Sequence, residues 1–179
     1  MNITPLPIPG AFKIEYEKKE DARGFFQRVY CENFFKKIGM PTNWVNTNIC
    51  FNKLKKTTRG LHYQSTPFEE DKLITCLDGA LFDVFVDMRP LSQTYLQWFG
   101  IELSKKNNTA LVIPKGCAHG YQTLTDNTLM MYQVSQFYNP AHEKGIRWND
   151  THIGIKWPYT SDIIISDKDS AWPLLQKGS

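Results

Sequence analysis

The sequence predicts an all-β protein, a mostly antiparallel jelly roll of the cupin type with one or two short helices. Short runs that are rich in β-branched and aromatic residues recur along the chain, and turn-forming residues separate them at the spacing of a sandwich or barrel. Aromatic residues make up 13% of the chain, and their large rings suit half-buried strands. The 179 residues have the size of one domain, so we expect a single domain over 1–179.

The first predicted elements follow a turn at 21–24. A strand is expected over 25–30, and a helix is expected over 32–38. Phe34 and Phe35 would point inward from this helix, and Gly39 would terminate it, because glycine readily adopts the conformation that ends a helix.

The middle of the chain predicts a succession of strands. Residues 44–52 alternate in polarity, which places four side chains on one face of a strand: Asn46, Asn48, Cys50 and Asn52. Residues 72–77 and 81–88 flank Asp78-Gly79, a turn sequence that predicts a hairpin. Further strands are expected at 96–103, 110–113, 121–124 and 130–137. A second short helix near the C-terminus is limited by Pro158 and Pro173.

Composition and charge exclude several classes of protein. The net charge is +3, from 21 basic and 18 acidic residues, and the chain lacks the clustered basic stretch of a nucleic-acid-binding protein. No stretch of 18 apolar residues predicts a membrane span, and the N-terminus does not resemble a secretion signal. The four cysteines have no CxxC spacing, so they predict neither a zinc site nor a disulfide framework. We therefore expect a cytoplasmic protein.

The densest group of polar residues is the segment RGLHYQ at 59–64. If the segment is a strand, His62 and Gln64 point to the same side, because residues two apart share a face. A barrel interior that also receives Asn46 and Asn48 would be unusually polar unless it binds a ligand. Taken alone, however, a histidine beside apolar residues is more often structural.

A second histidine, His119, precedes Gly120 in the segment PKGCAHG and raises the question of a metal. Cupin metal sites usually contain an HxH pair, a nearby glutamate and a distant histidine. Here Tyr63 and Gln64 follow His62, so the pair is missing, and Cys117 with two distant histidines does not specify a site. We expect no metal and no cofactor.

Lys72, Tyr132 and Asp169 are unremarkable individually, since lysines and C-terminal acidic residues are usually exposed and a strand tyrosine usually packs in a core. Together with a histidine they could catalyse proton transfer beside a ketone. A histidine paired with a carboxylate is a general base, a lysine can stabilise an enolate oxygen, and a tyrosine can act as the acid on the opposite face.

Several motifs in a fixed order resemble the dTDP-4-dehydrorhamnose 3,5-epimerase family, a group of metal-free cupins. The resemblance covers nearly the whole chain and rests on DARGFF at 21–26, RGLHYQ at 59–64, FDVFVDMR at 82–89, IPKGCAHGY at 113–121, MMYQVSQFYNP at 130–140, RWND at 147–150, IGIKWP at 153–158 and SDKD at 166–169. It implies a homodimer that acts on a nucleotide-linked 4-keto-6-deoxyhexose in deoxysugar biosynthesis, such as O-antigen or other polysaccharide synthesis. It implies no nucleic-acid or membrane partner.

The same resemblance implies roles for individual residues. His62 would be the base, Asp169 its orienting partner, Tyr132 the acid and Lys72 the group that stabilises the enolate. The residues implied to bind the substrate are Arg23 and Arg59 at the diphosphate, Phe25 and Arg28 near the nucleobase, His119 at the sugar, and Asn46, Asn48, Gln64, Tyr138, Glu143 and Lys168 as further contacts.

The chain departs from the family pattern mainly around the proposed nucleotide and sugar sites. Arg28 replaces the acidic residue of RGFFxE, Glu70 replaces a glutamine, and Cys50 and Tyr121 replace a serine and a phenylalanine. Because an arginine only donates hydrogen bonds, Arg28 leads to the hypothesis that a CDP-linked sugar is used at least as well as a dTDP-linked one.

Three alternatives to the 3,5-epimerase remain. One is an epimerase that acts at C3 only on a CDP-linked sugar, and another is a non-catalytic cupin that binds a nucleotide sugar. Retention of His62, Tyr132 and Asp169 argues against the second, because binding alone would not require all three. A 3,4-ketoisomerase is disfavoured, since cupins of that activity lack the RGLHYQ segment.

Overall fold

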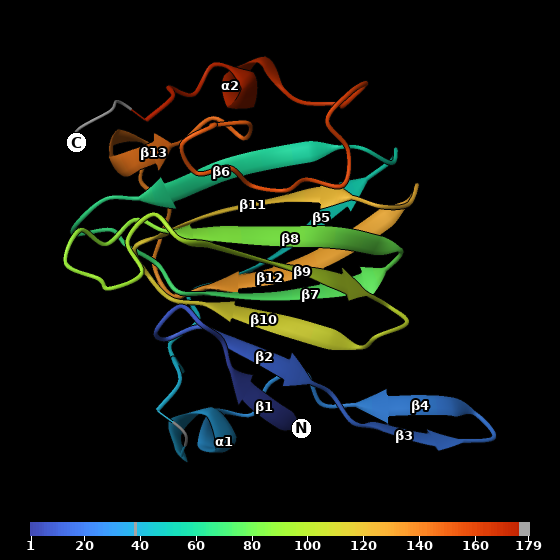
Figure 1. Ribbon diagram of the computed structural model, residues 1–179. Helices are drawn as coiled ribbons and strands as arrows, with labels where there is room; N and C mark the ends of the chain where they lie inside the picture. The colour runs from blue at the N-terminus through green and yellow to red at the C-terminus, as the bar shows by residue number, and fades with distance from the viewer. Residues whose placement is uncertain (38, 176–179) are drawn as a thin grey trace.

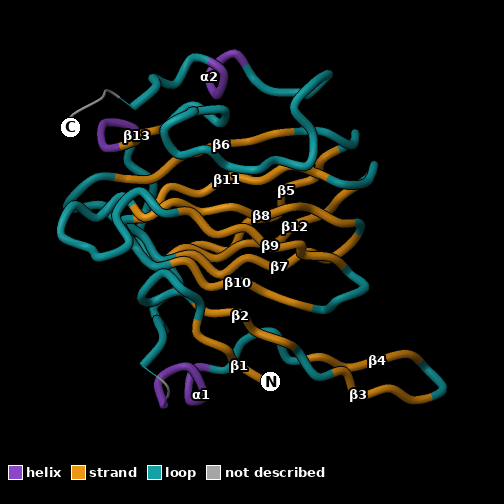
Figure 2. The backbone as a smooth tube through the Cα atoms, in the orientation of Figure 1, coloured by secondary structure: helices purple, strands orange, loops and turns teal. Residues whose placement is uncertain are grey.

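A computed structural model describes residues 1–37 and 39–175. Figure 1 shows two facing sheets with chain segments above and below them, and Figure 2 shows that loops join most of the strands. The elements are β1 (Asn2–Pro5), β2 (Phe12–Glu15), β3 (Lys18–Asp21), β4 (Gly24–Gln27), α1 (Glu32–Lys37), β5 (Asn46–Asn52), β6 (Thr58–Gln64), β7 (Lys72–Asp78), β8 (Ala80–Asp87), β9 (Trp98–Ser104), β10 (Thr109–Ile113), β11 (Cys117–Thr123), β12 (Thr128–Val134), a 3₁₀ turn (Pro140–His142), β13 (Glu143–Gly145) and α2 (Asp167–Ser170).

The predicted fold class is confirmed. One sheet has the strand order β1-β2-β10-β7-β12-β5, the other has the order β13-β6-β11-β8-β9, and β3 pairs only with β4. Every described strand pair is antiparallel. Side chains that point between the two sheets form a core that includes Ile74, Phe85, Leu111 and Met130.

The predicted hairpin at Asp78-Gly79 is wrong. β7 lies in the six-stranded sheet between β10 and β12, whereas β8 lies in the five-stranded sheet between β11 and β9. Both edges of each strand are therefore occupied by other partners. The turn instead carries the chain from one sheet to the other, with Gly79 at a φ of 72°, a conformation that glycine adopts without steric cost.

The two ends of the chain cover the outer faces of the sheets (Figure 1). The N-terminal segment and α1 pack Tyr16 and Phe35 against Leu73 of β7. As predicted, α1 points Phe34 and Phe35 inward, and Gly39 follows it with a φ of 71°; position 38, the predicted last residue of the helix, lies outside the described residues. On the other sheet, the C-terminal segment packs Trp157 over Val84.

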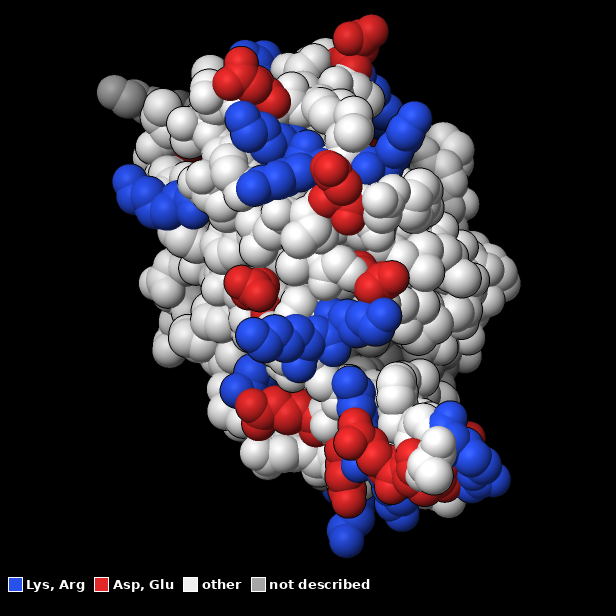
Figure 3. Space-filling view, turned by 90° about the vertical axis from the view of Figure 1, so that its right-hand side faces the viewer, with Lys and Arg blue, Asp and Glu red and all other residues white. Residues whose placement is uncertain are grey.

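The β3–β4 hairpin projects from the body of the molecule (Figure 1). Phe25 and Phe26 on this hairpin are 57% and 60% exposed. Side chains of both charges lie intermixed on the face toward which it projects, as Figure 3 shows. Neither sign dominates this face.

A bulge in β6 determines which of its side chains point between the sheets. His62 pairs with His119 and Arg59 pairs with Tyr121, so three steps along β6 face two steps along β11. The extra residue lets Arg59 and His62 point to the same side, although three positions apart they would face opposite sides of a regular strand. Gly60 allows this close packing: a Cβ there would lie 2.6 Å from Cα of Gly120.

Replacement of Gly60 should therefore be strongly destabilising. Gly60→Ala combines a φ of 103° with that clash, and we expect it to lower the free energy of unfolding by about 2–5 kcal/mol. Gly154→Ala is the matched control, because Gly154 also has a positive φ but the nearest atom to its Cβ would be 3.7 Å away. Urea unfolding of both variants measures the difference; equal losses would show that the close approach at Gly60 is unimportant.

Candidate active site

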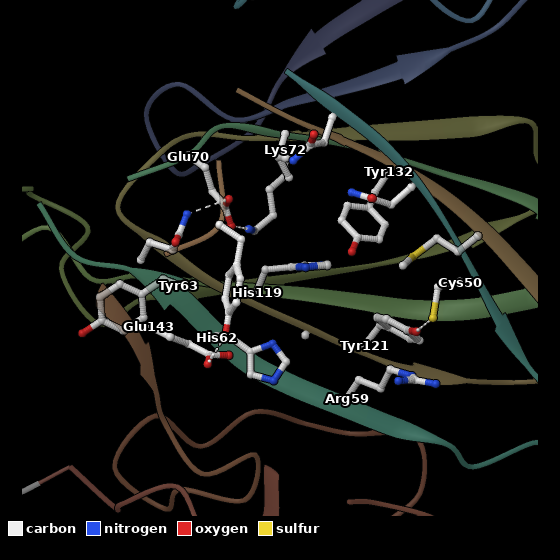
Figure 4. A pocket seen from close by; sticks show the side chains of 17 residues that line it. Cys50, Arg59, His62, Tyr63, Glu70, Lys72, His119, Tyr121, Tyr132 and Glu143 are labelled. Carbon is white, nitrogen blue, oxygen red and sulfur yellow. Dashed lines mark hydrogen bonds and ion pairs between the residues drawn. The ribbon is translucent and has the colours of Figure 1, made fainter. Parts of the chain in front are cut away.

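A cavity of about 390 Å³ opens between the two sheets. Figure 4 shows the side chains that line it, which come from β5, β7 and β12 on one wall and from β6 and β11 on the other. Alternation along the strands explains this composition, because every second residue of β5 and β12 points inward. The inward residues at the cavity are Asn46, Asn48, Cys50, Met130, Tyr132 and Val134.

His62 and Asp169 form a hydrogen-bonded pair, although they are far apart in the sequence. Nε2 of His62 lies 2.7 Å from Oδ1 of Asp169, and Oδ2 accepts from the backbone N–H of Gly60 at 3.2 Å. Burial disfavours the charged carboxylate, but these bonds and the attraction of His62 outweigh it and lower the pKa of Asp169. An ionised Asp169 accepts the Nε2 proton of His62, which leaves Nδ1 free to take up another proton.

The helix α2 holds Asp169 in place. Ser166 caps this helix and accepts a hydrogen bond from the backbone N–H of Asp169. Trp172, two residues beyond the helix, packs edge-on against the His62 ring with 6.3 Å between centroids. The C-terminal segment thus closes the cavity wall behind His62.

Tyr132 lies on β12, and His62 lies on β6 in the opposite sheet. Both side chains line the cavity, as Figure 4 shows. Burial raises the pKa of Tyr132, with smaller contributions from Cys50 and Glu70 that outweigh the opposing attraction of Arg59. The phenol therefore stays protonated at neutral pH. An acceptor and a donor of protons thus face the cavity from opposite walls.

Lys72 begins β7, and its ammonium group forms an ion pair with Glu70 inside the cavity. The side chains of Lys72 and Glu70 are only 11% and 13% exposed. The general expectation that a lysine is a solvated surface charge therefore does not hold here.

Nε2 of His119, on β11, lies 3.0 Å from both carboxylate oxygens of Asp83. Asp83 on β8 is fully buried, and burial raises its pKa against the attraction of His119. The sequence analysis missed Asp83, although the alternation of FDVFVD places it on the same face as Phe85. Among residues 1–37 and 39–175, no group of three or more His, Cys, Asp or Glu side chains is arranged to hold a metal ion.

Arg59 is anchored by a hydrogen-bonded group at one end of the cavity. Its Nε donates to Oδ1 of Asn52 at 3.0 Å, and the same oxygen accepts from the Tyr121 hydroxyl at 3.2 Å. That hydroxyl also lies 3.1 Å from Sγ of Cys50. Two residues that depart from the family pattern, Cys50 and Tyr121, therefore meet with Asn52 beside one arginine.

The mouth of the cavity carries a second polar cluster. Glu143 accepts from the Tyr138 hydroxyl at 2.8 Å and from Nζ of Lys168 at 2.7 Å. Burial opposes ionisation of Glu143, but the bonds from Lys168 and Tyr138 outweigh it and lower its pKa. Gln64 lies deeper, where its side chain binds the backbone of residues 137 and 139.

Lys168 lies at the mouth and does not line the cavity, and three further residues implied to bind substrate lie away from it. Arg23 is paired with Asp21 at the end of the projecting hairpin, and Phe25 lies on the same hairpin. Arg28 lines a separate hollow with Phe26. The sequence could not separate these residues from the cavity, because their position depends on where the hairpin points.

The described part of the chain contains no helix long and apolar enough to cross a membrane.

Comparison with known proteins gives consistent matches over the whole chain. Residues 5–177 match the family model described as dTDP-4-dehydrorhamnose 3,5-epimerase. A relative of that name from Sinorhizobium fredii is 41% identical and covers 98% of this chain and 90% of its own length. The Escherichia coli enzyme of the same name is 40% identical, over 94% of this chain and 91% of its own.

Solved structures agree with these matches. The Bacillus anthracis dTDP-4-dehydrorhamnose 3,5-epimerase with TDP and PPi bound has a TM-score of 0.94 at 39% identity, and covers 97% of this chain and 99% of its own. A Legionella pneumophila 3,5-epimerase in complex with dTDP-4-keto-L-rhamnose has a TM-score of 0.91 at 35% identity, over 97% of this chain and 92% of its own.

Proposed function

The chain belongs to the dTDP-4-dehydrorhamnose 3,5-epimerase family, and we propose that it epimerises a dTDP-linked 4-keto-6-deoxyhexose at C3 and C5. The observation that carries the proposal is the arrangement of His62 with Asp169 on one wall of the cavity and Tyr132 on the other. Inversion of a carbon centre requires a proton to leave from one face and return on the other, and this arrangement supplies both groups.

The chemistry follows from the ketone at C4, which acidifies the hydrogens at C3 and C5. His62 takes a proton from the carbon, and the electron pair of the C–H bond moves to form the enolate. The ammonium group of Lys72 stabilises the negative oxygen. Tyr132 gives its proton to the same carbon from the opposite face, and solvent returns the two side chains to their starting states. No electrons are gained or lost overall, so the reaction needs no redox cofactor.

The diphosphate of the substrate fits the side of the cavity where Asn52 anchors Arg59, because a guanidinium group binds phosphate oxygens well. A dTDP-linked substrate is supported by the relatives that contain TDP or a dTDP-sugar. No observation favours the CDP-linked alternative. A cytoplasmic location, expected from the sequence, stays a prediction.

We also propose that the protein is a homodimer. Arg23 and Phe25, implied to contact the substrate, lie on a hairpin that projects from the body of their own chain and do not line its cavity. Such residues can reach a substrate only in a second subunit. The hairpin carries the exposed Phe25 and Phe26, and Ile49 and Phe51 are exposed on the outer face of β5, which supplies apolar surface for an interface. Sedimentation equilibrium should give the mass of two chains.

The function is tested by NMR in D₂O with dTDP- and CDP-linked 4-keto-6-deoxyglucose. We expect deuterium to enter at both C3 and C5 of the dTDP-linked sugar, with inversion at both centres. The same rates are expected after prolonged treatment with EDTA, because neither His62 nor His119 belongs to an HxH pair and Lys72 can stabilise the enolate oxygen. Exchange at C3 alone would indicate a 3-epimerase, and no exchange would indicate a binding protein. Activity that is lost on chelation and restored by a divalent metal would show that the reaction depends on a metal.

A further inference from the structure

Glu70 is a largely buried acidic residue, with 13% of its side chain exposed, that the proposed reaction does not use. It lies two residues before β7, and its side chain lines the cavity beside Lys72, as Figure 4 shows; it also contacts Gln64. A carboxylate in a sheltered position is costly unless its charge and hydrogen-bonding capacity are satisfied. Its two oxygens have different partners. Oε1 forms the ion pair with Nζ of Lys72, and Oε2 accepts from Nε2 of Gln64 at 3.0 Å.

The orientation of Gln64 is fixed by its other bonds. Its Oε1 accepts from the backbone N–H of Asn139 at 2.7 Å, and its Nε2, which carries two hydrogens, also lies within hydrogen-bonding distance of the carbonyl oxygens of Phe68 and Phe137. Rotating the amide of Gln64 by half a turn would place its N–H groups against the backbone N–H of Asn139, so a donor would face a donor. The observed orientation is therefore the favourable one. As a result, Glu70 faces a fixed N–H donor on one side and an ammonium donor on the other.

Only an acidic side chain satisfies both neighbours. A carboxylate accepts at both oxygens, whereas a glutamine has one acceptor and one donor. The NH₂ group of a glutamine at position 70 would point at either the amide NH₂ of Gln64 or the ammonium group of Lys72. In either case a donor would face a donor. Glu70 thus supplies the two acceptors that Gln64 and Lys72 need in this cavity, whereas the family pattern has a glutamine at this position.

We propose that Glu70 is a positioning residue for Lys72. Its carboxylate holds the ammonium group at the start of β7 and leaves the other N–H groups of Lys72 for a developing negative charge in the cavity. Through Gln64, the same carboxylate fixes Lys72 relative to residues 137–139, which precede Glu143 at the cavity mouth. The inference rests on the proposed function, in which Lys72 stabilises the enolate oxygen.

Kinetics of a double-mutant cycle test this role. We expect Glu70→Gln to lower kcat for deuterium exchange by about 10–100-fold, the value of a charge-assisted hydrogen bond, and to change KM less than about threefold. Because Glu70 acts through Lys72, adding Glu70→Gln to Lys72→Met should cost little more than Lys72→Met alone. Glu69→Gln is the matched control, since the neighbouring Glu69 does not line the cavity, and it should keep the wild-type rate.

Two kinetic results would overturn the inference. One is a full additional loss on the Lys72→Met background, which would show that Glu70 acts independently of Lys72. The other is a wild-type kcat for Glu70→Gln. Thermal unfolding of each variant checks that it is folded, so that a loss of kcat cannot be due to unfolding. A change in overall stability alone would not produce the expected non-additivity of the two substitutions.

A measurement without substrate separates this inference from the proposed function. Lysine ammonium protons held in an ion pair exchange slowly enough to be seen in ¹H–¹⁵N NMR spectra. We expect such a signal in the wild type and Glu69→Gln, and its loss in Lys72→Met and Glu70→Gln. A signal that persists in Glu70→Gln would refute the positioning role even if the enzyme is active. If the wild type catalyses no exchange but the signal behaves as expected, the proposed function fails and the ion pair stands.

Discussion

Replacement of His62 by alanine should lower deuterium exchange at both C3 and C5 by about 10²–10⁴-fold, the contribution of a positioned general base. Both centres are affected because a proton must be removed before any enolate exists, and His62, paired with Asp169 at the cavity, is the group proposed to remove it. Rates of exchange and inversion by NMR in D₂O measure the loss. Binding of the dTDP-sugar should change much less, since His62 acts on the carbon and not on the nucleotide.

His152→Ala is the control for this substitution. His152 is exposed, and only its backbone N–H forms a described hydrogen bond, to Asp150, so this variant should exchange at the wild-type rate. Exchange that survives in His62→Ala at either carbon would show that another group removes that proton. Loss at only one carbon would assign His62 to that centre alone.

The general architecture could be predicted from the sequence because it depends on local patterns. Alternation along 44–52 correctly placed Asn46, Asn48, Cys50 and Asn52 on one face, and the sheet order confirms a two-layer antiparallel fold. The N-terminal strands β1 and β2, as well as β3 and β13, were missed. These strands are only three or four residues long, so each offers too few alternations to distinguish a strand from a loop.

The wrong hairpin at Asp78-Gly79 has a different cause. A turn sequence specifies how the chain bends locally, but it does not specify the partners of the two strands. In this fold β7 pairs with β10 and β12, and β8 pairs with β11 and β9. Those partners all follow β8 in the sequence, and their packing overrides the local preference for a hairpin.

The candidate site shows the same division between local and long-range information. His62, Gln64, Lys72 and Tyr132 all line one cavity. Alternation predicted only that His62 and Gln64 share a face, and the resemblance to a family implied that Lys72 and Tyr132 join them. The pairing of His62 with Asp169 joins residues 107 positions apart, so only the resemblance to a family could suggest it. The ion pair of Glu70 with Lys72 could not be read from a pattern, because it depends on the path of the loop before β7 and on the fixed amide of Gln64.

The phenol of Tyr132 should have a separable role, and Tyr132→Phe tests it. The substitution removes one hydroxyl and keeps the ring, which packs against the core between the sheets. We expect inversion at the centre that Tyr132 protonates to fall by about 10²-fold or more. Proton abstraction should fall much less, because His62 and Lys72 remain. The variant should therefore exchange the hydrogen for deuterium faster than it inverts the carbon, whereas the wild type returns the proton from the opposite face.

Tyr159→Phe is the control for the loss of a hydroxyl group, because the Tyr159 ring lies beside Lys55 and outside the cavity. Inversion at the wild-type rate in Tyr132→Phe would show that water or another group supplies the proton. An equal fall in exchange and inversion would place the phenol before the enolate, as part of its stabilisation. The expected difference between the rates of exchange and inversion follows from the two walls of the cavity. A base on β6 can return a proton only to the face from which it removed it, so inversion requires a proton donor on the wall formed by β12.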